Sequence, residues 1–269
     1  EFVKTEDEAR KKYQQAIRAN PDATDLVPPP KGLNILDALA ASGLRSIRYY
    51  NEIPNVDKVT VNDMSVTAVA QAHENVAFNK VDPLAVVPNE GDATWVMYNS
   101  RSLPDAERFD VIDLDPYGSA APFIDGAVQS VANGGLLCVT CTDMAVLGGS
   151  YPETCFAKYR AMSMPKSQYL HELALRILLQ SIESHANRYG RYIVPLISTG
   201  IDFYARVFVR VYDGKHEVKN SLTKIGYVYQ STGCPSFHVQ PSGVFTGKSY
   251  QPNTGLPGKD GKCNETGKD

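Results

Sequence analysis

The consecutive residues Asp115-Pro116-Tyr117-Gly118 place an acid, a proline carbonyl and an aromatic ring at the end of an apolar run. The carboxylate and the carbonyl are hydrogen-bond acceptors, and proline has no N–H of its own. Together they can accept the hydrogens of an exocyclic amine and draw its lone pair out of conjugation with a base. Tyr117 can stack on that base. The motif predicts a reaction at the amine nitrogen, such as methylation; the alternative is a strand-ending turn.

Short apolar runs alternate with helical periodicity along most of the chain. We expect strands at residues 33–37, 57–62, 84–88, 109–114 and 135–141, with helices at 44–53, 66–77 and 119–132. A later helix is expected at 167–187. The residues of 204–212 alternate between Tyr or Arg and Ala or Val, which predicts a half-exposed strand, with RNA binding as the alternative. Strands separated by helices indicate an α/β fold with a doubly wound, mostly parallel sheet.

Acidic residues follow the ends of successive predicted strands, namely Asp37, Asp63, Asp92 and Asp115. In an open parallel sheet, ligands bind outside the carboxyl ends of the strands, near the point where strand order reverses. A carboxylate after the second strand can accept from both ribose hydroxyls of a nucleoside, and one after the third from an adenine amine. Each acid alone is more often a helix cap or a solvated residue. The series predicts a nucleoside site with the substrate acid beside it.

The loop after the first strand discriminates between nucleotide cofactors. A dinucleotide site needs Gly-x-Gly-x-x-Gly so that a pyrophosphate can approach backbone amides. Residues 37–43 read Asp-Ala-Leu-Ala-Ala-Ser-Gly, in which Gly43 is the only glycine. This acid-led loop resembles the first motif of class I S-adenosylmethionine methyltransferases, with Leu39 and Ala41 where glycines are commoner. An oxidoreductase is therefore the weaker alternative.

Longer motifs resemble the tRNA guanine-26 N2-dimethyltransferase family, and its eukaryotic members most closely. They are residues 35–49 (ILDALAASGLRSIRY), the pair Asn62-Asp63, residues 113–119 (DLDPYGS) and residues 134–145 (GGLLCVTCTDMA). The resemblance covers residues 31–213 and implies a Rossmann-like class I methyltransferase fold. It also implies transfer of methyl groups from S-adenosylmethionine to the exocyclic N2 amine of guanine 26 in tRNA.

The resemblance implies two groups of site residues. Cofactor binding would fall to Asp37, Gly43, Arg45, Asp63, Asp92 and Ala93. Guanine binding would fall to Pro116 and Tyr117 beside the catalytic residue Asp115. A carboxylate there stabilises the positive charge that develops on the nitrogen and can take its proton. As an alternative to cofactor binding, Arg45 could be a charged residue on the surface of a helix. Asp113 could either support the site residues or be a polar residue packed in the sheet.

Composition limits the partners and compartments. No apolar run reaches the ~20 residues of a membrane span, and no secretory signal opens the chain. Five cysteines form no disulfide pattern, and Cys138 and Cys141 are expected in the core rather than on a metal. We therefore expect no membrane partner, no bound metal and an intracellular monomer, nuclear or mitochondrial if eukaryotic. The net charge of −3 means that binding of tRNA depends on a local basic patch.

Two regions are expected, a catalytic domain over residues 1–213 and a partial C-terminal tRNA-binding domain or flexible tail over 214–269. The first includes a helix at residues 5–19. The family's upstream Asn-Arg-Asp segment is missing before Glu1, so we expect a truncated chain. Two alternatives to the main hypothesis are an inactive paralogue kept as an RNA-binding scaffold and an enzyme for another RNA guanine. The intact Asp63, Asp92 and Asp115 argue against the scaffold.

Overall fold

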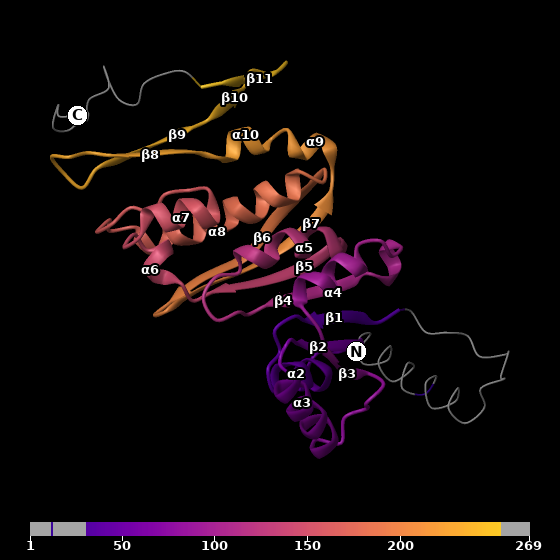
Figure 1. The fold of residues 1–269 in the computed structure, drawn as a ribbon. Helices are drawn as coiled ribbons and strands as arrows, with labels where there is room; N and C mark the ends of the chain where they lie inside the picture. Colours follow the sequence, from indigo (N-terminus) through magenta and orange to yellow (C-terminus); the bar gives the residue numbers. More distant parts are fainter. Residues whose placement is uncertain (1–11, 13–30, 254–269) are drawn as a thin grey trace. The chain divides into compact units, whose positions relative to one another are not determined.

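The computed structural model describes residue 12 and residues 31–253, which form two compact units (Figure 1). The first unit contains the described residues of 1–143 together with 195–211, and the second contains those of 144–194 and 212–269. The helix expected at 5–19 lies outside the described residues. The expected functional boundary at residue 213 stays a prediction.

A seven-stranded sheet in the order β3-β2-β1-β4-β5-β7-β6 organises the first unit. Its strands are β1 (Leu33–Asp37), β2 (Val56–Asp63), β3 (Val86–Glu90), β4 (Phe109–Leu114), β5 (Val131–Cys141), β6 (Arg191–Ile201) and β7 (Tyr204–Asp213); β6 and β7 carry residues of both units. The pairs from β3 to β5 are parallel, and β5 pairs with β7 antiparallel. The doubly wound, mostly parallel fold is thus confirmed, and strand order reverses between β1 and β4.

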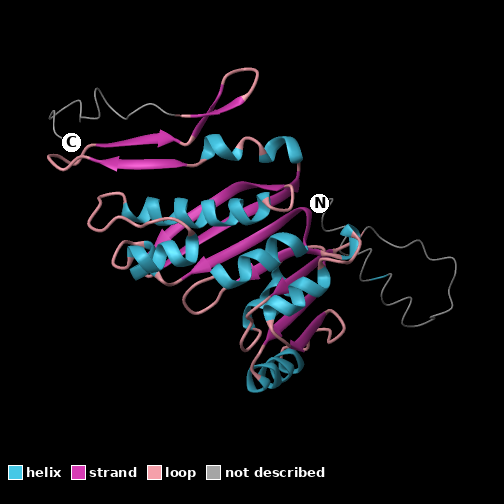
Figure 2. Ribbon diagram, turned by 45° about the horizontal axis from the view of Figure 1, so that its top comes forward, coloured by secondary structure: helices cyan, strands magenta, loops and turns pink. Residues whose placement is uncertain are grey.

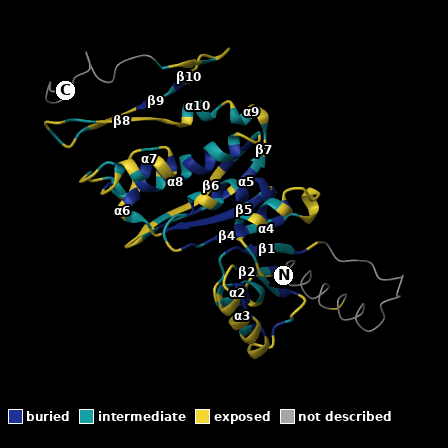
Figure 3. Cartoon of the chain, in the orientation of Figure 1, coloured by how far each residue is buried: buried dark blue, intermediate teal, exposed yellow. Residues whose placement is uncertain are grey.

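Helices connect the parallel strands. They are α2 (Leu44–Glu52), α3 (Val66–Phe78), α4 (Ala93–Ser100) and α5 (Ala121–Ser130), with a 3-10 turn at Asp105–Glu107. Ser65 caps α3, because its hydroxyl accepts from the amide of Ala68 at 3.4 Å. Strands β4 and β5 are largely buried (Figure 3). Leu36, Ile112 and Leu114, which lie on one face of the sheet, are each 0 % exposed.

Local hydrogen bonding explains where the elements differ from expectation. The third strand begins at Val86 instead of residue 84, because Asp82 closes a turn by accepting from the amides of Leu84 and Ala85 at 3.0 and 3.1 Å. The fifth strand starts earlier than expected, at Val131. Helix α4 and strand β6 were not expected at all.

The second unit contains α6 (Met144–Leu147), α7 (Pro152–Tyr159), α8 (Leu170–Asn187), α9 (Lys215–Val218), α10 (Ser221–Lys224), β8 (Gly226–Gln230), β9 (Phe237–Pro241), β10 (Gly243–Phe245) and β11 (Tyr250–Pro252). The helix expected at 167–187 is present as α8, and its buried face includes Ile177, Leu178 and Ile182, each at most 3 % exposed. Strands β8 and β9 pair antiparallel, as do β10 and β11 (Figure 2). In the part of the chain that the structure describes, no helix combines the length and apolarity needed to cross a bilayer.

Candidate active site

The expected acids follow neighbouring strands at one edge of the sheet. Asp37 ends β1 and is in register with Asp113 of β4, so Asp115 begins the adjacent loop. Asp63 ends β2 and is in register with Glu90 of β3, just before Asp92. The reversal of strand order lies between β1 and β4, which is where open parallel sheets bind ligands.

Asn62 and Asp63, at the end of β2, hold the loops that follow β1 and β3. The amide nitrogen of Asn62, which is 0 % exposed, donates to the carbonyls of Ala38 at 2.9 Å and Gly91 at 3.0 Å. The carboxylate of Asp63 accepts from the backbone amides of Ala41 and Ser65, both at 2.9 Å. Each carboxylate oxygen has two lone pairs, so Asp63 retains acceptor capacity for ribose hydroxyls.

The loop after β1 packs closely against β2 and α3. Gly43 has φ +73°, and a Cβ atom there would stand 3.0 Å from Cγ1 of Val61 and 3.3 Å from Cβ of Ala72. Ala41 also adopts positive φ, at 47°, and its amide is held by Asp63. A non-glycine residue therefore occupies one of the loop's left-handed positions with support from a hydrogen bond.

Asp92 is the N-cap of α4. Its Oδ1 accepts from the amides of Thr94 at 2.7 Å and Trp95 at 3.2 Å. Oδ1 of Asp92 therefore acts as a helix cap, which is the common role of an acid that follows a strand. A cofactor contact would use the other carboxylate oxygen, and Ala93, the neighbouring residue, is buried in the first turn.

Large apolar side chains stand exposed close to three of the acids. Met64, Trp95 and Tyr117 are 74 %, 67 % and 104 % exposed. Flat or polarizable side chains of this kind can cover the face of a purine. Sequence reasoning selected Tyr117 and missed Met64 and Trp95. Met64 and Trp95 could have been found from the sequence, because each is a large apolar residue within a few positions of a strand-end acid.

The Asp115 loop is attached to the end of β5. The amide of Gly118 donates to Oγ1 of Thr142 at 2.7 Å, and the amide of Thr142 donates to the carbonyl of Gly118 at 2.8 Å. Gly118 has φ +86°, and a Cβ there would meet nothing within 4 Å. Pro116 is buried. The Asp115 side chain is 28 % exposed, so its carboxylate is fixed at the base of the loop yet open to solvent.

Arg45 contacts Asp115, the acid expected at the guanine site. Its Nη1 donates to Oδ2 of Asp113 at 2.9 Å, and its Nη2 forms a second ion pair with Oδ2 of Asp115. Arg45 was expected among the cofactor residues, and Asp115 among the guanine residues. The ion pair between them therefore links the two expected groups.

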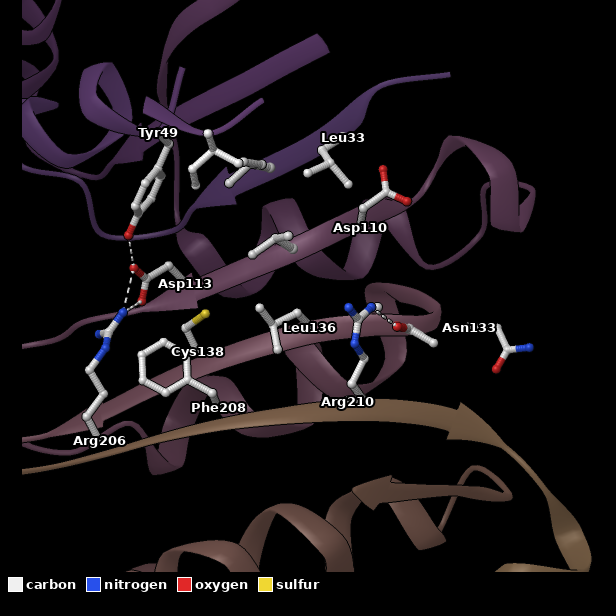
Figure 4. A pocket seen from close by; sticks show the side chains of 15 residues that line it. Leu33, Tyr49, Asp110, Asp113, Asn133, Leu136, Cys138, Arg206, Phe208 and Arg210 are labelled. Atoms are coloured by element: carbon white, nitrogen blue, oxygen red, sulfur yellow. Dashed lines mark hydrogen bonds and ion pairs between the residues drawn. The ribbon is translucent and has the colours of Figure 1, made fainter. Parts of the chain in front are cut away.

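Asp113 is the centre of a buried charge cluster that sequence reasoning left undecided. It is 1 % exposed and accepts from Nη2 of Arg206 with both oxygens at 3.0 Å. The Tyr49 hydroxyl also donates to it (Figure 4). Arg206 donates in addition to Oγ1 of Thr140. An open groove of about 680 Å³ runs beside this cluster, and its lining includes Leu136. Asp113 thus supports the site through Arg45.

Asp37 is 2 % exposed and accepts from the Ser46 hydroxyl at 2.7 Å, which fixes the first turns of α2. Burial, and next the charge of Asp113, raises the pKa of Asp37 to about 7. This acid supports the loop from below, and its expected cofactor contact stays a prediction.

Substituting Asp37 by asparagine is expected to change how stability depends on pH. An acid with a raised folded pKa contributes stability that is fully present below its unfolded pKa of about 4 and is lost as pH rises toward the folded value. Relative to Asp37→Asn, the wild-type free energy of unfolding should therefore fall between about pH 4 and about pH 7, by at most about 1.4 kcal/mol per pH unit, and then level off. Urea denaturation of both proteins across this range measures the difference, and parallel curves would contradict it.

The cysteines Cys138 and Cys141 lie in the core, as expected. Both are buried and neither forms a disulfide bond. Burial, with the charge of Asp113 second, raises the pKa of Cys138 to about 12. Within residues 31–253, no cluster of at least three His, Cys, Asp or Glu side chains could hold a metal ion.

Known proteins have sequences similar to that of this chain. The sequence model of a family described as "N2,N2-dimethylguanosine tRNA methyltransferase" matches residues 3–268. Over 217 residues, or 81 % of this chain, the sequence is 56 % identical to a mouse protein and 53 % identical to a human protein, each named "tRNA (guanine(26)-N(2))-dimethyltransferase". The aligned part is 32 % of either relative, so the chain spans about a third of their length.

A solved structure has the same fold. It is described as a complex of Trm1 from Pyrococcus horikoshii with S-adenosyl-L-methionine, and it matches with a TM-score of 0.72 and 29 % sequence identity. The match covers 91 % of this chain and 66 % of the archaeal one.

Proposed function

We propose that this chain, which belongs to the N2,N2-dimethylguanosine tRNA methyltransferase family, transfers methyl groups from S-adenosylmethionine to the N2 amine of guanine 26 in tRNA. The observation that carries the proposal is the position of Asp115, a partly exposed acid at the strand-order reversal, two residues before the fully exposed ring of Tyr117. The names of the mouse and human relatives support the choice of substrate.

The residues at the edge of the sheet fit the proposed cofactor. Asp63 has acceptor capacity for the ribose, Asp92 has an oxygen outside its capping contacts, and Met64 and Trp95 can cover the adenine. The tight loop ending at Gly43 carries no pyrophosphate cradle, and a cofactor with a methionine in place of phosphates needs none. When bound, the cofactor supplies an electrophilic methyl group on its sulfonium. Asp37, Gly43, Arg45 and Ala93 complete the proposed set.

In the proposed reaction Asp115 accepts a hydrogen bond from the guanine amine and orients its lone pair. The carboxylate stabilises the positive charge that develops on nitrogen and then takes the proton. The carbonyl of Pro116 is the second acceptor and Tyr117 stacks on the base. Most of the acceleration would come from orientation, because a methyl transfer requires the two reactants in line.

The proposed partner is tRNA, and the proposed state is a monomer. One yeast relative, 46 % identical over 212 residues, is named as mitochondrial. On that basis we propose an intracellular enzyme of the nucleus or the mitochondrion.

A labelled-methyl assay tests the proposal. Unmodified tRNA transcripts with guanine or adenine at position 26 are incubated with the protein and labelled S-adenosylmethionine. We expect label only in the guanine transcript, at N2. Equal labelling of both transcripts would refute the substrate. If the protein bound tRNA but neither bound the cofactor nor transferred label, the scaffold alternative would replace the enzyme.

A further inference from the structure

We propose that Arg45 makes the guanine site depend on the carboxylate of the cofactor, so that the cofactor must bind before the amine. The inference rests on the proposed function. It concerns the order of binding at the same site, which neither the fold nor the family description specifies.

The amine and Arg45 require the same acceptor. Nη2 of Arg45 is paired with Oδ2 of Asp115, and the two side chains are 39 % and 28 % exposed. A guanidinium on a carboxylate forms charge-assisted hydrogen bonds, which are stronger than the bonds of a neutral amine. A base amine that arrives first therefore competes poorly for Asp115.

Asp113 allows Arg45 to leave Asp115 without losing its anchor. Nη1 of Arg45 stays on Oδ2 of Asp113 at 2.9 Å, and Asp113 is held in turn by Arg206 and Tyr49. Asp113 is 1 % exposed, so this end of the contact is the rigid one. Arg45 can exchange one carboxylate partner for another by moving its exposed Nη2 alone.

A cofactor carboxylate is the partner that would draw Nη2 away. Arg45 is the second residue of α2, directly after the proposed cofactor loop, and the cofactor's methionine end is zwitterionic. The neighbouring cations that the structure describes are already committed: Arg48 pairs with Glu52 at 2.8 Å, and Arg206 pairs with Asp113. The exchange keeps the charge of Arg45 paired and exposes the lone pairs of Asp115 to the amine.

The test separates the carboxylate from the rest of the cofactor. S-adenosylhomocysteine carries the carboxylate, whereas 5′-methylthioadenosine carries only the adenosine and sulfur. The contact of the amine with Asp115 is measured as the ratio of the dissociation constants of tRNA with inosine 26 and tRNA with guanine 26, because inosine is guanosine without the N2 amine. We expect saturating S-adenosylhomocysteine to raise this ratio by about tenfold or more, and 5′-methylthioadenosine to leave it near one.

Arg45→Met gives the second arm, with Arg48→Met on the same helix as the matched control. In Arg45→Met the ratio of the two dissociation constants should be high in the absence of S-adenosylhomocysteine. Adding S-adenosylhomocysteine should not change it. An unchanged affinity for 5′-methylthioadenosine shows that the variant still folds its adenosine site. Arg48→Met should behave as the wild type, because its partner is the exposed Glu52.

The outcomes distinguish this inference from the proposed function. An equal effect of both adenosine compounds, or a response to S-adenosylhomocysteine that survives in Arg45→Met, overturns the role of Arg45 even if guanine 26 is methylated. Failure to label guanine 26 at all overturns the proposed function instead.

Discussion

Asp115→Asn is expected to lower the rate of methyl transfer to guanine 26 by about 10³-fold. The substitution keeps the shape of the side chain and removes its charge. The amide can neither take the proton nor stabilise the positive charge that develops on nitrogen. Its NH₂ group would also face the hydrogens of the amine whenever it turns toward them. Single-turnover assays with saturating cofactor and tRNA isolate this step from binding.

Binding of the cofactor should survive the same substitution. Asp115 contacts Arg45 and belongs to the loop held by Thr142, while Asp63 and Asp92 lie on other strands. Calorimetric titration with S-adenosylhomocysteine is expected to give at least the wild-type affinity, because a neutral side chain at position 115 competes less well for Arg45. Asp57→Asn, on an exposed residue near the amino end of β2, is the matched control and should retain full activity. A wild-type transfer rate in Asp115→Asn would refute the catalytic role.

Sequence patterns predicted the central elements because their physical signals are local. Each of β1, β2 and β4 is a short run rich in apolar residues that leads to an acid, and parallel pairing then brings Asp37, Asp63 and Asp115 to one edge. The pair Asn62-Asp63 could also be recognised from the sequence, because it ends the run that forms β2. Its role in tying two loops together becomes visible only when Ala38 and Gly91 are seen on either side of it.

The missed features depend on contacts between distant segments. Arg206 is separated from Asp113 by 93 residues, and no local spacing relates them. The alternation of 204–212 predicted the strand correctly, and the burial of Val207, Val209 and Val211 confirms its inner face. The other face was expected to be half-exposed, and its residues are intermediate or exposed. The ion pair of Arg206 with the buried Asp113 was not foreseen. Helix α4 was missed although a helix cap was one interpretation of Asp92, because its eight residues are too few for a clear apolar period.

The same cluster should make Asp113 one of the most sensitive positions for stability. Asp113→Leu leaves the guanidinium of Arg206, 17 % exposed, without its carboxylate and removes one of the two partners of Arg45. Removal of one member of a buried ion pair typically costs about 3–5 kcal/mol, because the remaining charge stays desolvated. Urea denaturation followed by circular dichroism is expected to show a loss of this size in the free energy of unfolding.

A double-mutant cycle tests whether the loss comes from the uncompensated charge. If Arg206 is replaced by leucine as well, the desolvated cation is gone, so the double variant should be more stable than the sum of the two single losses predicts, by about 1–3 kcal/mol. The exposed pair Arg48–Glu52 provides the comparison, where coupling should stay within about 0.5 kcal/mol. Additive losses at Asp113 and Arg206 would mean that packing, rather than charge, stabilises this part of the sheet.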